Sequence, residues 1–324
     1  MSNMKSLFAI EKKPVRGLMA FEWVVMAYGL FTLLMVLVMF TRLDHPTGMI
    51  WDRLRLLTVI PALWAVYRLL PCRLTLLARV AGQLASLSWW YPDTYELNKA
   101  LPNLDHVFAS FEQSVFGCQP ALLFSRYVSS PVFSELMDLG YASYFPMIVA
   151  VTLFYFFYRP QEFTRMAFVT LAAFMIYYVI FVFLPVTGPQ YYYLAVGEDR
   201  IAQGIFPDIG DYFRHSQERM VSPGWSHGFF YGLVEDAHNA GERPTAAFPS
   251  SHVGITTILL LQAWHTRNRR FFWTLVPFFV LMFFATVYIK AHYAVDAVAG
   301  LASGFLMYVV LYGCSRRIKA KGLF

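Results

Sequence analysis

The sequence has few charged residues and very little cysteine. Only 14% of its 324 residues are Asp, Glu, Lys or Arg, whereas a soluble globular domain has about 25%. Cys72, Cys118 and Cys314 are isolated, and none has the CxxC spacing of a zinc or redox site. No block of basic residues alternates with aromatic residues, so nothing indicates a nucleic-acid partner. These absences argue against a soluble domain and against a cysteine-based metal or redox centre.

The sequence is instead rich in apolar residues, since 58% of the residues are hydrophobic and 18% are aromatic. Eight segments approach the ~20 residues that span a bilayer. They are roughly 21–40, 54–70, 74–91, 137–158, 165–186, 251–265, 271–290 and 293–313. The second and third are the weakest, because Arg68, Arg73, Arg79 and Gln83 interrupt them. The first is long enough to span, and no small-residue cleavage site follows it, so we expect no cleaved signal peptide. The pattern predicts an all-α, polytopic membrane helix bundle with about eight spans.

Basic residues mark one side of the expected membrane. They lie in the two tails and in alternate connections: Lys5, Lys12, Lys13, Arg16, Arg68, Arg73, Arg159, Arg165, Arg267, Arg269, Arg270, Arg316, Arg317, Lys319 and Lys321. By the positive-inside rule both ends are cytoplasmic, and the connections 92–136 and 187–250 lie outside. We expect an N-terminal part, 1–91, with a cytoplasmic tail and accessory membrane helices, followed by a catalytic membrane domain, 92–324.

The two long outer connections have a composition that favours ordered structure. Residues 108–116 can form an amphipathic helix in the membrane interface. The region 187–250 is rich in aromatic residues, which argues against disorder, and we interpret it as a lid or a headgroup-binding layer. Its run Tyr191–Tyr193 is typical of an interfacial aromatic belt. We interpret His215, His227 and His238 as surface residues, because they have no metal-ligand spacing.

His292 and Asp296 form the first candidate catalytic motif. They follow the apolar segment 271–290 and are four residues apart, which places them on one helical face. A carboxylate there can accept the Nδ1 proton of the imidazole and leave Nε2 as a free lone pair, as in hydrolase triads. The alternative is a structural polar pair that caps a helix. Function is favoured, because ionisable groups near a membrane interior are costly.

Residues 249–252, Pro-Ser-Ser-His, form the second motif at the start of the segment 251–265. Ser250 or Ser251 can cap the helix, whose first N–H groups form an anion site suited to phosphate. His252 then stands beside the phosphate as general acid or base; otherwise it is an interfacial histidine after an ordinary serine cap. The chain runs down one segment and back up the next, so both histidines and residues 185–190 meet at one outer surface.

Four further residues are candidates for binding phosphate or a polyol. Lys290 can stabilise phosphate charge or can extend to the interface, and Arg243 is a comparable candidate. Gln190 and Tyr191 follow a Gly-Pro turn and can hydrogen-bond phosphate or hydroxyl groups. With no metal-ligand cluster in the sequence, we expect no metal and no other cofactor.

These motifs resemble those of the phosphatidic acid phosphatase type 2 superfamily, and over residues 100–313 the chain is most similar to its inositol phosphorylceramide synthase branch. Pro249–His252 stands where the superfamily has its second motif, usually Pro-Ser-Gly-His, and His292–Gly300 stands for the third. The resemblance implies a six-helix phosphatase-type core. It also implies that His292 forms a phosphohistidine, that Asp296 orients it, and that His252 protonates the leaving alkoxide. Residues 116–120 and 187–192 resemble weaker features of the synthase branch.

The chain departs from the phosphatases of that superfamily at two places. Residues 183–190 carry no base where those enzymes have Lys and Arg-Pro, and Thr286 stands where they have an arginine six residues before the histidine. A phosphodiester monoanion needs less positive charge than a phosphomonoester dianion. The departures therefore favour transfer of a phospho-headgroup, phosphoinositol from phosphatidylinositol, to a ceramide-like acceptor.

Two alternatives remain open at this point. In the first, the protein is a lipid phosphatase in which water replaces the acceptor. In the second, it is a non-catalytic membrane protein or lipid transporter of the same fold, although the intact set of His252, His292 and Asp296 argues against it. For either enzyme the orientation places the site on the non-cytoplasmic face of a bacterial inner membrane or a eukaryotic endomembrane such as the Golgi.

Overall fold

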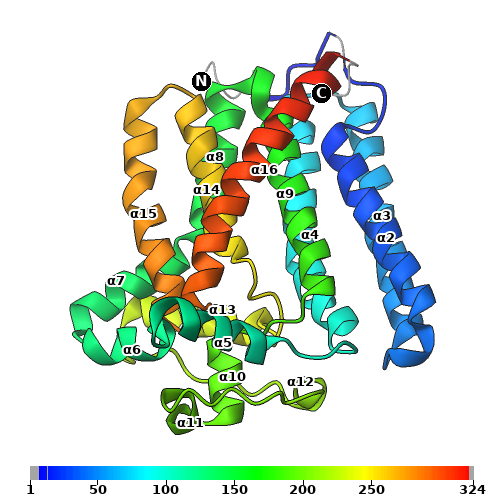
Figure 1. Cartoon of the computed structure of the whole chain (residues 1–324). Helices are drawn as coiled ribbons and strands as arrows, with labels where there is room; N and C mark the ends of the chain where they lie inside the picture. Colours follow the sequence, from blue (N-terminus) through cyan, green and yellow to red (C-terminus); the bar gives the residue numbers. More distant parts are fainter. Residues whose placement is uncertain (1–6, 13, 321–324) are drawn as a thin grey trace. The chain divides into compact units, whose positions relative to one another are not determined.

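The computed structural model describes residues 7–12 and 14–320, with side chains to 318, and these residues form helices and their connections (Figure 1). Across these residues there is no β-strand, and an isolated antiparallel bridge joins Ile10 to Cys72. The all-α prediction is confirmed. Of the basic residues that suggested the orientation, Lys5, Lys13 and Lys321 lie outside the described residues, as does the side chain of Lys319.

All eight apolar segments are largely helical. In chain order the helices are α2 (Ala20–Val38), η1 (Phe40–Arg42), α3 (Pro46–Leu69), α4 (Arg73–Asn98), α5 (Asp105–Phe116), α6 (Pro120–Tyr127), α7 (Pro131–Ala142), α8 (Tyr144–Tyr158), η2 (Pro160–Glu162), α9 (Phe163–Phe183), α10 (Pro189–Val196), α11 (Glu198–Ala202), α12 (Tyr212–His215), α13 (Phe229–Gly241), α14 (Ser251–His265), α15 (Arg269–Tyr288) and α16 (Ala294–Ala320).

The long apolar helices fit an integral membrane protein. Among the described residues, four stretches are long and apolar enough to span a bilayer: Ala20–Val38, Pro160–Phe183, Arg269–Tyr288 and Ala294–Ile318. Helices α7 and α8 form a pair bent by 46°, which makes a fifth candidate if it is one span. The expected count of eight is not confirmed, because arginines interrupt α3 and α4 and because α14, with 15 residues, is shorter than the ~20 residues that a span needs.

The chain forms two compact units that are interleaved in sequence. The first comprises 1–91, 152–176 and 309–324, and the second comprises 92–151 and 177–308. In the first unit, Arg79 of α4 and Glu22 of α2 form an ion pair with no exposed side-chain surface, and Arg79 Nε lies 2.7 Å from Glu22 Oε1. A buried charge is tolerated when it is paired, which explains how an arginine fits inside the third apolar segment. The expected functional domain, 92–324, stays a prediction.

In the second unit, glycines let α14 and α16 approach closely. A Cβ on Gly304 would lie 2.4 Å from the carbonyl oxygen of Gly254, and one on Gly300 would lie 2.4 Å from that of Ser250. Gly300 and Gly304 are four residues apart, the spacing that brings membrane helices into backbone contact. The first turn of α16 therefore lies against the first turn of α14, and Ser250 N donates to Asp296 O at 3.0 Å.

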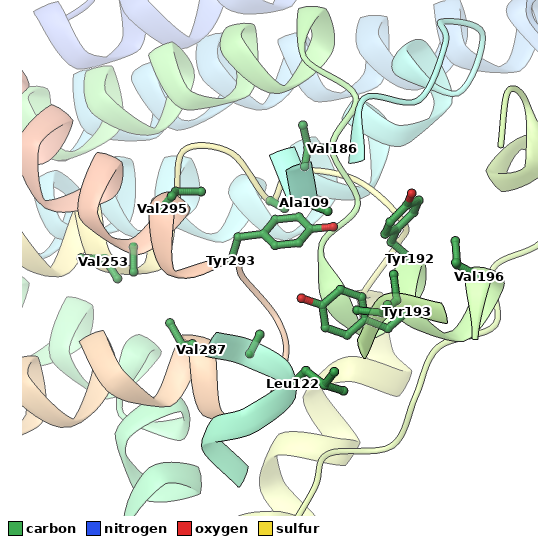
Figure 2. Close-up of a cluster of buried hydrophobic side chains, with 14 residues drawn as sticks. Ala109, Leu122, Val186, Tyr192, Tyr193, Val196, Val253, Val287, Tyr293 and Val295 are labelled. Atoms are coloured by element: carbon green, nitrogen blue, oxygen red, sulfur yellow. The ribbon is translucent and has the colours of Figure 1, made fainter. Parts of the chain in front are cut away.

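The short helices α5, α6 and α10 to α13 gather at one end of α14, α15 and α16 (Figure 1). The amphipathic segment 108–116 lies within α5, and its place in the membrane interface stays a prediction. The region 187–250 contains α10 to α13, so it is structured. Tyr191, Tyr192 and Tyr193 of α10 are at most 1% exposed, and Figure 2 shows the latter two among buried side chains.

The interpretation of these tyrosines as an aromatic belt is therefore wrong. A belt residue keeps its hydroxyl group at the bilayer surface, whereas the hydroxyls of Tyr192 and Tyr193 bind protein. Tyr192 Oη donates to Pro207 O at 2.7 Å, and Tyr193 Oη donates to Gln119 Oε1 at 2.8 Å. The sequence does not show that α10 buries all three tyrosines and exposes Leu194 instead.

Candidate active site

His292 lies in the short connection between α15 and α16 and is 3% exposed. Its Nδ1 lies 2.7 Å from the carbonyl oxygen of Ala247, and a carbonyl can only accept a hydrogen bond, so Nδ1 carries the proton. The lone pair is left on Nε2, which lies 3.4 Å from Nδ1 of His252. This is the tautomer that a nucleophilic histidine needs.

Asp296 does not make the hydrogen bond that its spacing from His292 suggests. Its Oδ2 is 3.7 Å from His292 Nδ1, too long for a hydrogen bond, and accepts instead from the backbone N–H of Tyr293 at 2.9 Å. Because α16 begins at Ala294, Asp296 is the third residue of the helix and caps it in the manner of a capping box. The carbonyl of Ala247 takes the place predicted for the carboxylate.

His252 lies in the first turn of α14, with its ring between two tyrosines. The ring centroid is 4.7 Å from that of Tyr141, in a stacked arrangement, and 4.5 Å from that of Tyr144. The predicted serine cap is confirmed for Ser250, whose side chain accepts from Val253 N at 3.4 Å. Ser251 is buried. The two rings restrict the plane of the His252 imidazole and aim Nδ1 at His292.

Burial sets the protonation state of His292. The loss of water around the ring lowers the pKa of His292 to about 4, against the opposing effects of the Ala247 carbonyl and the charge of Glu242. The ring is therefore neutral near pH 7, and the Nε2 lone pair is available for attack. Burial, and then the neighbouring His292, lower the pKa of His252 as well. The site therefore pairs two neutral rings, and His252 has to gain a proton before it can act as a general acid.

A comparison with family models identifies the fold family. A model described as the PAP2 superfamily matches residues 106–310, which include both histidines and Asp296. The chain belongs to the PAP2 superfamily. Membership indicates an activity of the lipid phosphatase or phosphotransferase type. A search of curated proteins and a search of solved structures each found no match. The finer likeness to inositol phosphorylceramide synthases stays a prediction.

In this PAP2 superfamily member, the cation beside His292 is already paired. Lys290 forms an ion pair with Glu198 of α11, and Glu198 also lies 2.7 Å from Arg126 of α6. Burial acts to raise the pKa of Glu198, but these two cations hold it below its usual value. Lys290 has a left-handed backbone (φ 64°), and its carbonyl accepts from Gln190 N at 2.7 Å. The charge of Lys290 is thus shared with a carboxylate before any phosphate is bound.

The other candidate binding residues lie in the same unit. Gln190 is 2% exposed, and its Nε2 has no hydrogen-bond partner in the described part of the chain. Tyr191 is buried beside Phe213, with ring centroids 6.2 Å apart. Arg243 is partly buried and donates from Nη1 to the carbonyl of Glu242 at 2.8 Å. Their roles as substrate ligands stay predictions.

Two carboxylates of α5 hold the site together and were not identified from the sequence. Asp105 is fully buried and accepts hydrogen bonds from Thr187 N at 2.7 Å, Gly188 N at 2.9 Å and Tyr293 Oη at 3.1 Å. It thereby ties the Thr187–Gly188 turn to the residue after His292. Glu112 lies seven residues after Asp105, on the same face of α5. Its side chain accepts a hydrogen bond from Val295 N at 3.1 Å, and burial raises the pKa of Glu112 to about 8. The only signal in the sequence was two acids on one face of an amphipathic helix.

Gly188 makes the close approach of these segments possible. Its φ is 93°, a left-handed conformation that favours glycine. A Cβ at this position would lie 2.5 Å from the carbonyl oxygen of Ala291, the residue before His292. The Thr-Gly-Pro-Gln sequence therefore has a steric role beside the loop that carries His292, in addition to any role in binding.

The histidines of the region 187–250 differ from one another. His215 and His227 are exposed, as predicted. His238 is 3% exposed, so its interpretation as a surface residue is wrong. It lies on the inner face of α13, against Tyr141, at a ring-centroid distance of 5.5 Å. The local sequence does not indicate this burial, because Glu235, Asp236 and Asn239 around His238 are polar.

Proposed function

We propose that the protein is a membrane lipid phosphotransferase that moves a phospho-headgroup from a phospholipid to a lipid hydroxyl group through a phosphohistidine on His292. The observation that carries the proposal is the buried, neutral His292, whose Nε2 lone pair faces Nδ1 of His252 at 3.4 Å. The donor class is a phosphodiester such as phosphatidylinositol, and the acceptor is a ceramide-like lipid.

The chemistry takes two displacements at phosphorus. In the first, Nε2 of His292 attacks, the P–O bond to diacylglycerol breaks, and His252 gives its proton to the leaving oxygen. In the second, the acceptor hydroxyl attacks, His252 takes its proton, and the P–N bond breaks. The phosphorus has to enter between the two rings, so we expect His252 to move away from His292 when the substrate binds. The carboxylate of Asp296, 3.7 Å from His292, favours the cation that forms on the ring.

Charge favours a diester over a monoester substrate. Lys290 is paired with Glu198, Thr286 replaces the arginine of the phosphatases, and residues 183–190 contain no base. A phosphomonoester dianion would require more compensating charge than these residues leave available. The alternative is a lipid phosphatase that uses the same histidines with water as the acceptor.

The deciding experiment compares donors and acceptors. Protein purified in detergent is incubated with headgroup-labelled phosphatidylinositol, with and without ceramide, and separately with phosphatidic acid, and the products are separated by chromatography. Transfer of the labelled headgroup to ceramide supports the phosphotransferase. Release of inorganic phosphate from phosphatidic acid, with no transfer to ceramide, supports the phosphatase instead.

The lowered pKa of His292 predicts an unusual pH profile. His292 attacks only when neutral, so the rate should fall as pH drops through the pKa of this ring. With that pKa near 4, the acid limb of kcat/KM should lie near pH 4, rather than near the ~6.5 of an ordinary histidine. Measuring kcat/KM between pH 3.5 and pH 8 tests this, and an acid limb near 6.5 would show that the ring is well solvated in the free enzyme.

We also propose that the site opens on the non-cytoplasmic face. The basic residues at 267–270 and in the tails set the orientation by the positive-inside rule. In a variant without the native cysteines, Ala240→Cys, at an exposed position of α13, should react in intact cells with a membrane-impermeant thiol reagent. Asn268→Cys, in the exposed connection between α14 and α15, should react only after the cells are permeabilised. The reverse pattern would place the site in the cytoplasm.

A further inference from the structure

Helix α7 turns one face toward α13. Glu135, Asp138 and Tyr141 are three residues apart and so share this face. Glu135 accepts from the backbone N–H of Phe230 at 3.1 Å and of Tyr231 at 3.0 Å, which fixes the start of α13. Tyr141 contacts His238 near the other end of that helix. Asp138 lies between these two contacts.

Asp138 is buried without a hydrogen-bond partner, and the buried ring of His238 makes only a long contact with Glu235. Asp138 has no exposed surface, and both of its carboxylate oxygens lack a partner among the described residues. His238 Nε2 also lacks one, and Nδ1 lies 3.9 Å from Glu235 Oε1, beyond hydrogen-bond distance. Glu235 is engaged by Arg219 at 2.7 Å and by Ser222 N at 3.0 Å. Leaving buried polar atoms unpaired is costly, so such groups in a native protein call for an explanation, and a bound ligand is one.

One of these groups, His238, lies close to the catalytic histidine His252. Tyr141 contacts His238 on one side and stacks on His252 on the other, so one ring separates His238 from the general acid–base. Gln190 Nε2 and Ser222 Oγ of the same unit are among the other buried atoms that lack partners in the part of the chain that the structure describes. Met220 N donates to Gln190 O at 2.9 Å, which connects the segment carrying Ser222 to α10.

The hydrogen-bonding capacity of these side chains matches the hydroxyl groups of a ligand. The Gln190 amide donates, the Asp138 carboxylate accepts, and the Ser222 hydroxyl and the His238 ring do either. The nearby charge of Arg219 is matched by Glu235, so the groups suit a neutral polyol better than a second anion. A hydroxyl both donates and accepts, and a ring of hydroxyls can satisfy several such atoms at once.

We propose that Asp138 and His238, together with Gln190 and Ser222, form a subsite that recognises the hydroxyl groups of a polyol headgroup while its phosphate lies at His252 and His292. The proposal rests on the proposed function, because it assigns the headgroup end of the same substrate. Asp138 of α7 and His238 of α13 would then help to select the phospholipid donor, and both lie outside the two sequence motifs.

Binding to a variant without turnover tests the subsite. In the His292→Ala background, the affinity for glycerophosphoinositol is measured by equilibrium dialysis, with glycerophosphoethanolamine as the ligand that lacks the polyol ring. Asp138→Asn and His238→Gln should each weaken binding of the inositol ligand about tenfold, the effect of losing one well-made hydrogen bond. Binding of the ethanolamine ligand should stay within about twofold. His227→Gln, at an exposed histidine of the same region, is the matched control.

The outcomes separate this inference from the proposed function. If Asp138→Asn and His238→Gln, folded by their melting temperatures, bind both ligands as the parent does or lose both equally, the subsite is refuted. That result leaves phosphotransfer by the histidines intact. If the substitutions remove the preference for inositol, but the wild type transfers no headgroup from any phospholipid, the subsite stands and the proposed reaction fails.

Discussion

Replacing His292 by alanine should lower headgroup transfer by about three orders of magnitude or more, with the protein still inserted and folded. The reason is that no other nucleophile faces the phosphate position, and covalent catalysis ends when its nucleophile is removed. Initial rates in detergent, together with a melting curve for each variant, measure the effect. A variant that retains more than about a tenth of the wild-type rate would remove His292 from the mechanism.

His252→Ala should be comparably inactive, because the leaving alkoxide would depart without a proton. The double variant should be little worse than either single one, since residues that act in one step lose their effects together. His227→Ala, at an exposed histidine, is the control and should keep full activity. If the loss of rate in the double variant equalled the product of the two single losses, His252 and His292 would not act in the same step.

Gly304→Leu should destabilise the protein strongly. A Cβ at Gly304 would meet the carbonyl oxygen of Gly254 at 2.4 Å, so α14 and α16 would have to separate, and the two histidines would separate with them. Overpacking typically costs about 1–3 kcal/mol, and a clash with backbone cannot be relieved by a side-chain rotation. Thermal unfolding in detergent should show a much lower Tm than for the wild type.

Gly313→Leu is the matched control for that substitution. It lies on the same helix, and a Cβ there would have nothing within 4 Å. Its Tm should stay close to that of the wild type. Equal melting temperatures for the Gly304 and Gly313 variants would mean that the crossing of α14 and α16 does not depend on close backbone contact.

The sequence was sufficient to predict the helices and the meeting of the two histidines. Apolar segments of membrane length become helices because every backbone group must be paired inside the bilayer. One helical hairpin then returns the chain to the surface it left, which places His252 near His292. The error at Asp296 came from the helix boundary. The i,i+4 argument requires His292 to be helical, but α16 begins at Ala294, so the carboxylate reaches the N–H of Tyr293 instead.

The residues that position the site were not predictable in this way. Asp105 binds Tyr293 across 188 positions of sequence, and neither residue shows this partnership in its local pattern. Acids on a short amphipathic helix usually face solvent, which is why Asp105 and Glu112 looked unremarkable in the sequence. The burial of His238 depends likewise on the packing of α7 against α13, which periodicity within either segment does not reveal.

Formation of a phosphohistidine on His292 is the step most directly open to measurement. Protein mixed with headgroup-labelled phosphatidylinositol, without acceptor, is quenched in alkaline detergent, which preserves the P–N bond, and is analysed for protein-bound label. We predict label on the peptide that contains His292, its absence in His292→Ala, and its release as labelled lipid when ceramide is added. Headgroup transfer by the wild type with no protein-bound label on the timescale of turnover, together with an active His292→Ala variant, would contradict the mechanism.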